Sequence, residues 1–268
     1  MSGGSSSFEA ELLSVARAAA RAAAAELLAR YEAAPTDVAT KSTATDPVSA
    51  ADLAAEGAIR ELLAARRPDD AILGEEGGET GGREGSASGV RWVVDPLDGT
   101  VNYLYRYPQW SVSVACEDAD GTIAGVVLDP LRDEELAATR SGPALLNGAP
   151  VDRERGAETL ATALVATGFG YDAAVREGQA AVIARLLPRV RDIRRGGSAA
   201  LDLAWTAFGR CDAYYERGVQ PWDVAAGALI CARAGLELHE LPARDGEPAG
   251  LLAAPAALAT PLLALVRG

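Results

Sequence analysis

The segment with the clearest chemical potential is Val93-Val94-Asp95-Pro96-Leu97-Asp98-Gly99-Thr100. An apolar run predicts a buried strand ending in Asp95, Pro96 sets a turn, and Asp98 follows three residues after the first carboxylate. Gly99 has no side chain that would restrict the backbone, and it precedes an expected helix start. There, N–H groups and the helix dipole could bind phosphate oxygens. The pattern favours a site for a metal ion and a phosphate, although an Asp-capped turn without chemistry would have the same pattern.

Two other carboxylates occupy comparable places. Glu75 lies in a Gly-Glu-Glu-Gly segment after a short apolar strand, and Asp223 follows Pro-Trp in the first turn of a predicted helix. Two negative charges about 5 Å apart repel by roughly 3 kcal/mol at an effective dielectric of about 20. If both residues converge with Asp95 and Asp98, cations are needed, and oxygen ligands beside a phosphate favour Mg²⁺. Each acid taken alone would be an ordinary loop or helix-start residue.

Lys41 is the only lysine among the 25 basic residues of the chain. Lys and Arg are not interchangeable, because the ammonium group is compact and strongly hydrated. The single lysine therefore either marks a supporting role close to a site or is retained by chance.

The hydrophobic pattern predicts the elements that position these residues. A capping box at Ser6 and Glu9 opens a helix to about residue 32, and Ser49 with Asp52 opens a second helix through residue 63. Strands are expected at 71–73, 91–95, 111–117, 122–128 and 134–139, with a mobile loop at 77–89 and a tight turn at Asn147-Gly148. From residue 162 onward strands and helices alternate, which is typical of layered α/β structure.

Length and composition fit one continuous unit of 268 residues. We expect a single catalytic domain over residues 8–267 after a flexible leader at 1–7. The net charge of -13 argues against nucleic acid and anionic membranes as partners, and the alanine-rich stretch at 15–29 is too interrupted by charges for a membrane span. Three widely spaced cysteines fit neither a disulfide framework nor a zinc site, which favours a cytoplasmic location.

Four segments, in this order, resemble the inositol monophosphatase family: Asp46-Pro47-Val48-Ser49-Ala50-Ala51-Asp52, Gly74-Glu75-Glu76-Gly77, Trp92 to Thr100, and Trp222-Asp223-Val224-Ala225-Ala226-Gly227. The resemblance covers about residues 10–265. It implies a layered α-β-α-β-α sandwich, a homodimer, two or three Mg²⁺ ions per site and inhibition by Li⁺.

The resemblance also assigns site residues. One Mg²⁺ would be held by Glu75, Asp95 and the carbonyl of Leu97, and a second by Asp95, Asp98 and Asp223. Thr100, paired with Asp52, would help Glu75 activate the attacking water, and the N–H groups of Gly99 and Thr100 would hold phosphate oxygens.

The substrate side of the site is implied in the same way. Substrate contacts fall on Glu75, Leu97, Asp98, Gly99, Thr100, Gly197, Ser198, Ala199, Glu216 and Asp223. Glu216 matches the acid that binds a sugar hydroxyl, whereas Ser198 also fits a simple helix N-cap. Pro255 and Gln220 depart from the family pattern, so the last strand–helix join and the substrate preference stay open.

The resulting hypothesis is Mg²⁺-dependent hydrolysis of a small polyol monophosphate, with inositol-1-phosphate preferred. Fructose 1,6-bisphosphate, histidinol phosphate and 3′-phosphoadenosine 5′-phosphate are alternative substrates, and a mainly regulatory binding protein is an alternative of another class. The Asp95–Asp98 spacing is one residue too long for a haloacid-dehalogenase phosphatase. Cys211 and Arg217 have a tyrosine-phosphatase spacing, but no glycine lies between them to form an anion-binding loop, so we interpret the spacing as a coincidence. His239 is the only histidine of the chain, which argues against a phosphatase with a histidine nucleophile.

Overall fold

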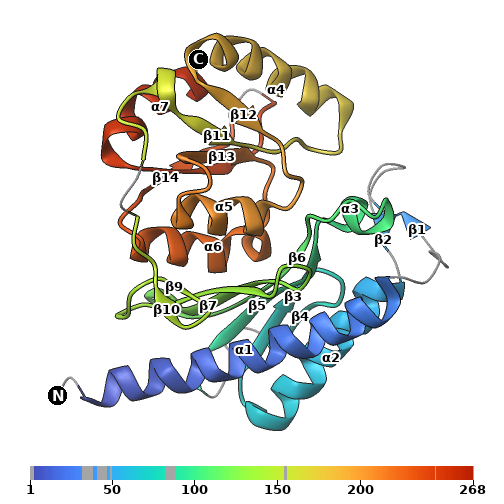
Figure 1. Ribbon diagram of the computed structural model, residues 1–268. Helices are drawn as coiled ribbons and strands as arrows, with labels where there is room; N and C mark the ends of the chain where they lie inside the picture. The colour runs from blue at the N-terminus through green and yellow to red at the C-terminus, as the bar shows by residue number, and fades with distance from the viewer. Residues whose placement is uncertain are drawn as a thin grey trace.

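The computed structural model describes residues 3–31, 39–40, 47–48, 50–81, 88–153, 156–244 and 246–267. The elements stack as helix, sheet, helix, sheet and helix (Figure 1). This arrangement confirms the layered α-β-α-β-α class. None of the described helices combines the length and apolar character needed to span a membrane.

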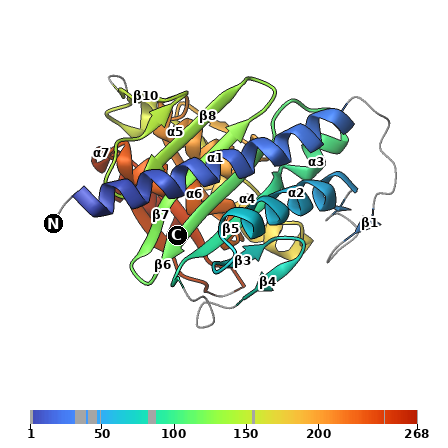
Figure 2. The ribbon, with the colours of Figure 1, turned by 90° about the horizontal axis from the view of Figure 1, so that it is seen from below.

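An outer helical layer and an eight-stranded sheet form the first half of the molecule. Helices α1 (Gly3–Tyr31) and α2 (Ala50–Arg66) cover one face of the sheet (Figure 2). The strand order is β10-β9-β8-β7-β6-β5-β3-β4, and only the β3–β5 pair is parallel. The strands are β3 (Ala71–Gly74), β4 (Gly78–Thr80), β5 (Arg91–Asp98), β6 (Ser111–Asp118), β7 (Gly121–Asp129), β8 (Glu134–Thr139), β9 (Leu145–Leu146) and β10 (Ala149–Pro150). A short helix α3 (Thr100–Leu104) follows β5, and β1 (Ala39–Thr40) pairs with β2 (Pro47–Val48).

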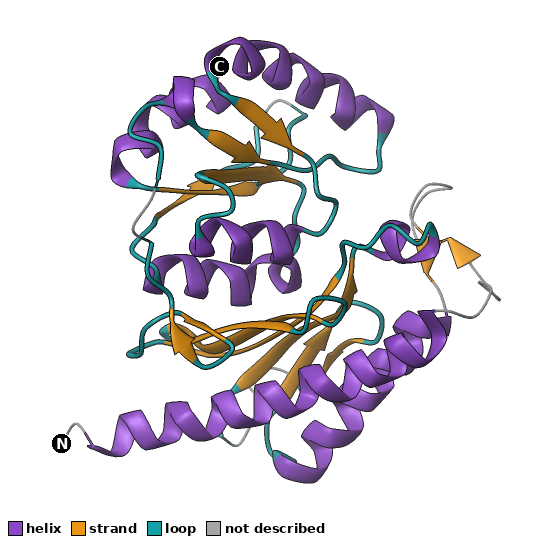
Figure 3. Cartoon of the chain, viewed as in Figure 1, coloured by secondary structure: helices purple, strands orange, loops and turns teal. Residues whose placement is uncertain are grey.

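The second half places a five-stranded sheet between two helix pairs (Figure 3). Helices α5 (Ala199–Phe208) and α6 (Pro221–Arg233) lie between the sheets, and α4 (Ala173–Leu186) and α7 (Ala256–Arg267) lie on the far side. The strand order is β12-β11-β13-β15-β14. These strands are β11 (Leu164–Ala166), β12 (Asp192–Arg194), β13 (Ala213–Arg217), β14 (Glu237–Leu241) and β15 (Gly250–Ala254). Single 3₁₀ turns lie at η1 (Leu160–Thr162) and η2 (Leu187–Arg189).

Small residues let the layers approach closely. The alanine-rich helix α1 buries a stripe of residues at helical spacing against the first sheet: Leu12, Ala16, Ala19, Ala20, Ala23 and Leu27. On the opposite face of this sheet, a Cβ atom added to Gly125 of β7 would lie 2.8 Å from the Cα of Ala226 in α6. Glycine at this position therefore sets the distance between sheet and helix.

Three local predictions were wrong. Helix α1 begins at Gly3, so Ser6 is inside the helix instead of capping it. Part of the expected loop at 77–89 forms strand β4, which pairs antiparallel with β3. Strand β5 does not end at Asp95 but continues to Asp98.

The tight turn at Asn147-Gly148 is confirmed. Both residues have positive φ angles, 49° and 80°, and they connect β9 to β10. Helix α5 ends at its C-cap Gly209, which adopts a left-handed conformation with φ 86°.

We predict that two Gly→Ala substitutions will change stability in opposite directions. Gly125→Ala should lower the free energy of unfolding by about 1–3 kcal/mol, because its Cβ overpacks the sheet–helix contact. Gly57 lies inside α2, and nothing is within 4 Å of a Cβ added there. Gly57→Ala should therefore raise the free energy of unfolding by about 0.5–1 kcal/mol. Urea unfolding of both variants checks this, and equal effects would contradict the packing described.

Candidate active site

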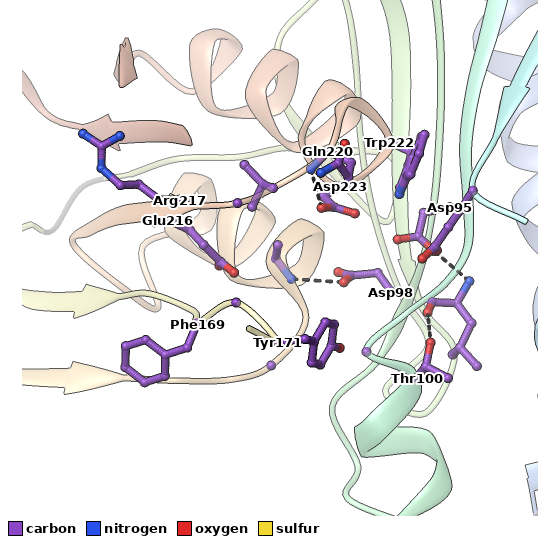
Figure 4. Close-up of a pocket in the computed structure, with 18 of the residues that line it drawn as sticks. Asp95, Asp98, Thr100, Phe169, Tyr171, Glu216, Arg217, Gln220, Trp222 and Asp223 are labelled. Carbon is purple, nitrogen blue, oxygen red and sulfur yellow. Dashed lines mark hydrogen bonds between the residues drawn. The ribbon is translucent and has the colours of Figure 1, made fainter. Parts of the chain in front are cut away.

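A cavity of about 610 Å³ is lined by residues from both halves of the chain (Figure 4). This volume is typical of small-molecule sites. Its walls come from the turn after β3, the end of β5, the loop after β11, the loop before α5 and the β13–α6 connection. The lining includes Glu75, Asp95, Leu97, Asp98, Gly99, Thr100, Gly197, Ala199, Glu216 and Asp223. The structure thus brings most of the sequence-derived site residues together, whereas Lys41 lies outside the described residues.

A bulge within β5 presents the two aspartates. The pairing of β5 with β6 shifts register between Asp95 and Asp98, and Pro96 has no N–H group to donate to the neighbouring strand. Asp95 is 2% exposed, and its Oδ1 accepts a hydrogen bond from the Leu97 N–H at 3.0 Å. The bulge therefore fixes the backbone of the motif while both carboxylates still line the cavity.

Asp98 connects the two halves of the molecule. Its Oδ2 accepts hydrogen bonds from the Ser198 hydroxyl and from the Ala200 N–H at 2.8 Å, and its Oδ1 accepts one from the Ala199 N–H at 3.2 Å. Ser198 is buried, caps α5 by accepting from Leu201 N–H, and is not among the lining residues. The structure therefore places Ser198 behind Asp98 rather than in the cavity, where a substrate contact was expected.

Thr100 and Asp52 form the expected pair. The Thr100 hydroxyl lies 3.0 Å from Asp52 Oδ1 and 3.2 Å from the carbonyl oxygen of Leu97, so its proton can be donated to either. Asp52 is fully buried in the first turn of α2 and does not line the cavity. It can act on the cavity through Thr100.

Asp223 belongs to a helix cap. It is the third residue of α6, and its Oδ2 accepts from the Gln220 N–H at 2.7 Å as half of a capping box. The Trp222 carbonyl also accepts a hydrogen bond from Ser113 at 3.0 Å, which ties the start of α6 to β6. These contacts hold Asp223 at the cavity wall.

Glu216 lies near the end of β13 and faces the cavity across from Asp98 (Figure 4). Its Oε2 accepts a hydrogen bond from the Tyr214 hydroxyl at 3.1 Å. A Cβ on Gly168 would lie 2.0 Å from Glu216 Oε1. The absence of a side chain at residue 168 therefore provides the space that the Glu216 carboxyl occupies.

Burial and mutual repulsion raise the pKa values of four acids of the cavity: Asp95, Asp98, Glu216 and Asp223. Desolvation raises the pKa of Asp95 and of Asp223 well above the usual range, and neighbouring carboxylates raise both further. Asp95 also forms a hydrogen bond with Glu75. Desolvation raises the pKa of Asp98 to about 6, although hydrogen bonds from α5 oppose the shift, and it raises the pKa of Glu216 to about 8.

The donor chemistry fits a hard divalent cation. The acids contribute only oxygen ligands, and such ligands are the ones that hard cations prefer. Within the described ranges, however, no three Asp, Glu, His or Cys side chains converge as a ready metal-binding group. Asp98 and Asp223 instead direct oxygens toward backbone N–H groups. The ligand assignments therefore remain predictions.

Sequence reasoning missed Asp202, which is 2% exposed behind the cavity. It accepts hydrogen bonds from the Gly196 N–H and from Gln109, both at 3.2 Å, and desolvation together with the charge of Asp98 raises its pKa to about 8. Asn102 donates to the carbonyls of Gly196 and Gln109 at 2.9 and 2.6 Å. In the sequence, Asp202 looks like an ordinary acid in the first turn of a helix. Only its distance of four residues from Ser198 could have indicated that it is buried next to the cavity.

Neither of the two alternative nucleophiles, Cys211 and His239, has the environment that such catalysis requires. Cys211 is 4% exposed, and burial raises the pKa of its thiol to about 12, which is the opposite of what a nucleophilic thiolate requires. Arg217 forms an ion pair with Glu247. His239 lies on β14 and does not line the cavity.

Comparison with known proteins finds relatives that match most of the chain. The family model of the inositol monophosphatase family matches residues 9–266. An inositol-1-monophosphatase of Mycobacterium bovis is 47% identical over 232 residues, covering 85% of this chain and 80% of the relative. The Nus factor SuhB of Escherichia coli is 39% identical over 225 residues, covering 84% and 83%. The crystal structure of extragenic suppressor protein suhB from Bartonella henselae superposes with a TM-score of 0.85 at 32% identity, covering 96% of this chain and 97% of that one.

The five-layered fold and these matches define the class as phosphoric monoester hydrolases, a group whose members in this fold are generally metal-dependent. Within this class, the chain belongs to the inositol monophosphatase family. The resemblance noted from its four segments is confirmed.

We predict that the metal-free protein will lose stability as pH rises. The folded-state pKa values of Asp98, Glu216 and Asp202, about 6, 8 and 8, lie above the ordinary value of about 4 for unfolded carboxyls. The unfolded chain then binds fewer protons than the folded one, so the free energy of unfolding falls between about pH 4 and pH 8. Thermal unfolding in chelator should show this fall, and added Mg²⁺ should raise the midpoint more at pH 8 than at pH 5. A midpoint in chelator that rises over this range would contradict the burial described.

Proposed function

We propose that this protein hydrolyses the phosphate monoester of a small polyol in a Mg²⁺-dependent reaction, with inositol-1-phosphate as the preferred substrate. The observation that carries the proposal is that carboxylates from three separate turns line one cavity with Glu216 on its opposite wall. The family membership supports the same reaction type.

The carboxylates provide the places for metal ions. Glu75, Asp95 and the Leu97 carbonyl would hold one Mg²⁺, and Asp95, Asp98 and Asp223 would hold a second. When bound, the ions would neutralise the charge of the phosphate and lower the pKa of a water molecule. Inhibition by Li⁺ and a homodimeric assembly are part of the proposal through the resemblance.

The residues of the chain would orient the reacting groups. When the Thr100 hydroxyl donates its proton to Asp52 or to the Leu97 carbonyl, its oxygen keeps lone pairs that can accept a hydrogen bond from a water molecule. Glu75 would accept a proton from that water. The backbone N–H groups of Gly99 and Thr100 would donate to phosphate oxygens at the beginning of α3. Thr100 thus has the geometry to position the attacking water.

The charges of the cavity favour a polyol with one phosphate. Among the described lining residues, the acids outnumber the two basic residues, Arg195 and Arg217. Arg217 is paired with Glu247 and donates to the carbonyls of Pro242 and Pro248, so Arg195 remains as the lining cation for a second phosphate. Polyol hydroxyls can donate to Glu216, Asp98 and Asp223. This charge balance supports inositol-1-phosphate over fructose 1,6-bisphosphate and 3′-phosphoadenosine 5′-phosphate.

The names of the relatives differ, so an assay must decide the activity. The relative from M. bovis is named for inositol-1-monophosphatase activity, and the relative from E. coli is named as a Nus factor. Turnover of inositol-1-phosphate, histidinol phosphate, fructose 1,6-bisphosphate and 3′-phosphoadenosine 5′-phosphate should be compared at saturating Mg²⁺. Highest kcat/KM for inositol-1-phosphate supports the proposal, and absence of turnover on all four contradicts it.

We predict that Asp95→Asn and Asp223→Asn each reduce kcat/KM more than tenfold without unfolding the protein. The amide keeps the size of the side chain and an oxygen that can accept the observed backbone N–H bond, but it removes the negative charge. Asp120→Asn, an exposed acid at the β6–β7 turn, is the matched control and should keep wild-type turnover. More than a tenth of wild-type activity in either cavity variant would count against the site.

We predict that Glu216→Gln raises KM for inositol-1-phosphate up to about tenfold and changes kcat less, because one lost hydrogen bond is worth roughly 0.5–1.5 kcal/mol. Gly168→Ala should act in the same direction, because its Cβ occupies the space of the Glu216 carboxyl. Gly178→Ala in α4 serves as the control, because nothing lies within 4 Å of its new Cβ and Gly178 does not line the cavity. Unchanged KM in the first two variants would remove the assigned role of Glu216.

A further inference from the structure

A second acid of α2 contacts the cavity wall from behind. Glu56 lies one helical turn after Asp52 and is only 3% exposed. Its Oε2 accepts a hydrogen bond from the Glu76 N–H and its Oε1 one from the Gly77 N–H, both at 2.8 Å. The two amides immediately following Glu75 are therefore bound by one buried carboxylate.

An arginine completes the arrangement. The Arg60 Nε donates to Glu56 Oε1 at 2.7 Å, and the same guanidinium donates to the Gly78 carbonyl at 2.7 Å and to the Thr80 hydroxyl at 3.0 Å. Charged hydrogen bonds of this kind are stronger and more directional than neutral ones. The Glu56–Arg60 pair thus holds the turn between β3 and β4 at both ends.

This contact explains the glycines of the Gly-Glu-Glu-Gly segment. A Cβ on Gly74 or on Gly77 would lie 2.6 Å from Glu56 Oε1. Neither glycine has a positive φ angle, so neither is needed for an unusual backbone conformation. Glycine is required at both positions because the Glu56 carboxyl occupies the space of their side chains.

We propose that Glu56 is a positioning residue that, through Glu75, sets the affinity of the cavity for a divalent cation. It fixes the turn that carries Glu75, whose carboxyl forms a hydrogen bond with Asp95 and lines the cavity. Together with Asp52, which holds Thr100, it makes α2 the element that positions two separate turns of the site. The inference depends on the proposed function only in that Glu75 is taken as a ligand.

The first test compares Glu56→Gln with Glu61→Gln, an exposed acid on the same helix. The amide cannot accept both backbone N–H bonds without placing its own NH₂ group against one of them. Mg²⁺ binding is measured by isothermal titration calorimetry well below the unfolding midpoint of each variant. Residues that orient metal ligands typically contribute 10- to 100-fold to affinity, so Glu56→Gln should bind at least tenfold more weakly and Glu61→Gln within twofold of wild type.

A double-mutant cycle tests the route through Glu75. Mn²⁺ binding followed by electron paramagnetic resonance extends the measurement to weak affinities. In a Glu75→Gln background, Glu56→Gln should reduce affinity less than twofold further, because the ligand that it positions is already lost. A further tenfold loss, or wild-type affinity in the Glu56 single variant, would overturn the proposal.

Failure of the proposed function can be distinguished from failure of the proposal for Glu56. A wild type that binds Mg²⁺ but hydrolyses no polyol phosphate contradicts the function while the affinity comparison still tests Glu56. A wild type with no Mg²⁺ affinity overturns both. If Glu56→Gln does not fold, Gly77→Ala displaces the same carboxyl and should weaken Mg²⁺ binding, with Gly57→Ala as its control.

Discussion

The constraint on which the structure depends is the burial of several carboxylates around one cavity. Each loses hydration there, and each raises the pKa of its neighbours. Such an arrangement is unfavourable for folding alone, and a core of apolar residues at the same positions would avoid it. Its presence is understandable if the acids bind a cation beside an anionic substrate, which is the chemistry that the family membership supports.

The rest of the fold holds these acids in place against their repulsion. The N-terminus of α5 donates backbone hydrogen bonds to Asp98, the capping box of α6 holds Asp223, and α2 contributes two buried acids that fix neighbouring turns. Because α5 and α6 lie between the two sheets, the site is shared by both halves of the chain. This division explains why its residues are spread from Glu75 to Asp223.

Much of the site could be predicted because its residues follow strand ends and helix starts. The motif around Asp95 and the helix start at Asp223 have turn and cap signals that depend on local sequence. The bulge that extends β5 to Asp98 could not be predicted, since it depends on pairing with β6. Ser198 was expected in the cavity, but its hydroxyl donates to Asp98 instead. Glu56 and Asp202 look like ordinary helical acids, and only tertiary contacts reveal that both are buried.

The most direct measurement is an anomalous difference map from crystals grown with Mn²⁺ at pH 8. We predict a peak in the cavity within coordination distance of Asp95 and of at least one of Glu75, Asp98 and Asp223. No peak at a Mn²⁺ concentration that supports full activity, or a peak only at another location, would show that the buried acids serve some purpose other than binding a cation.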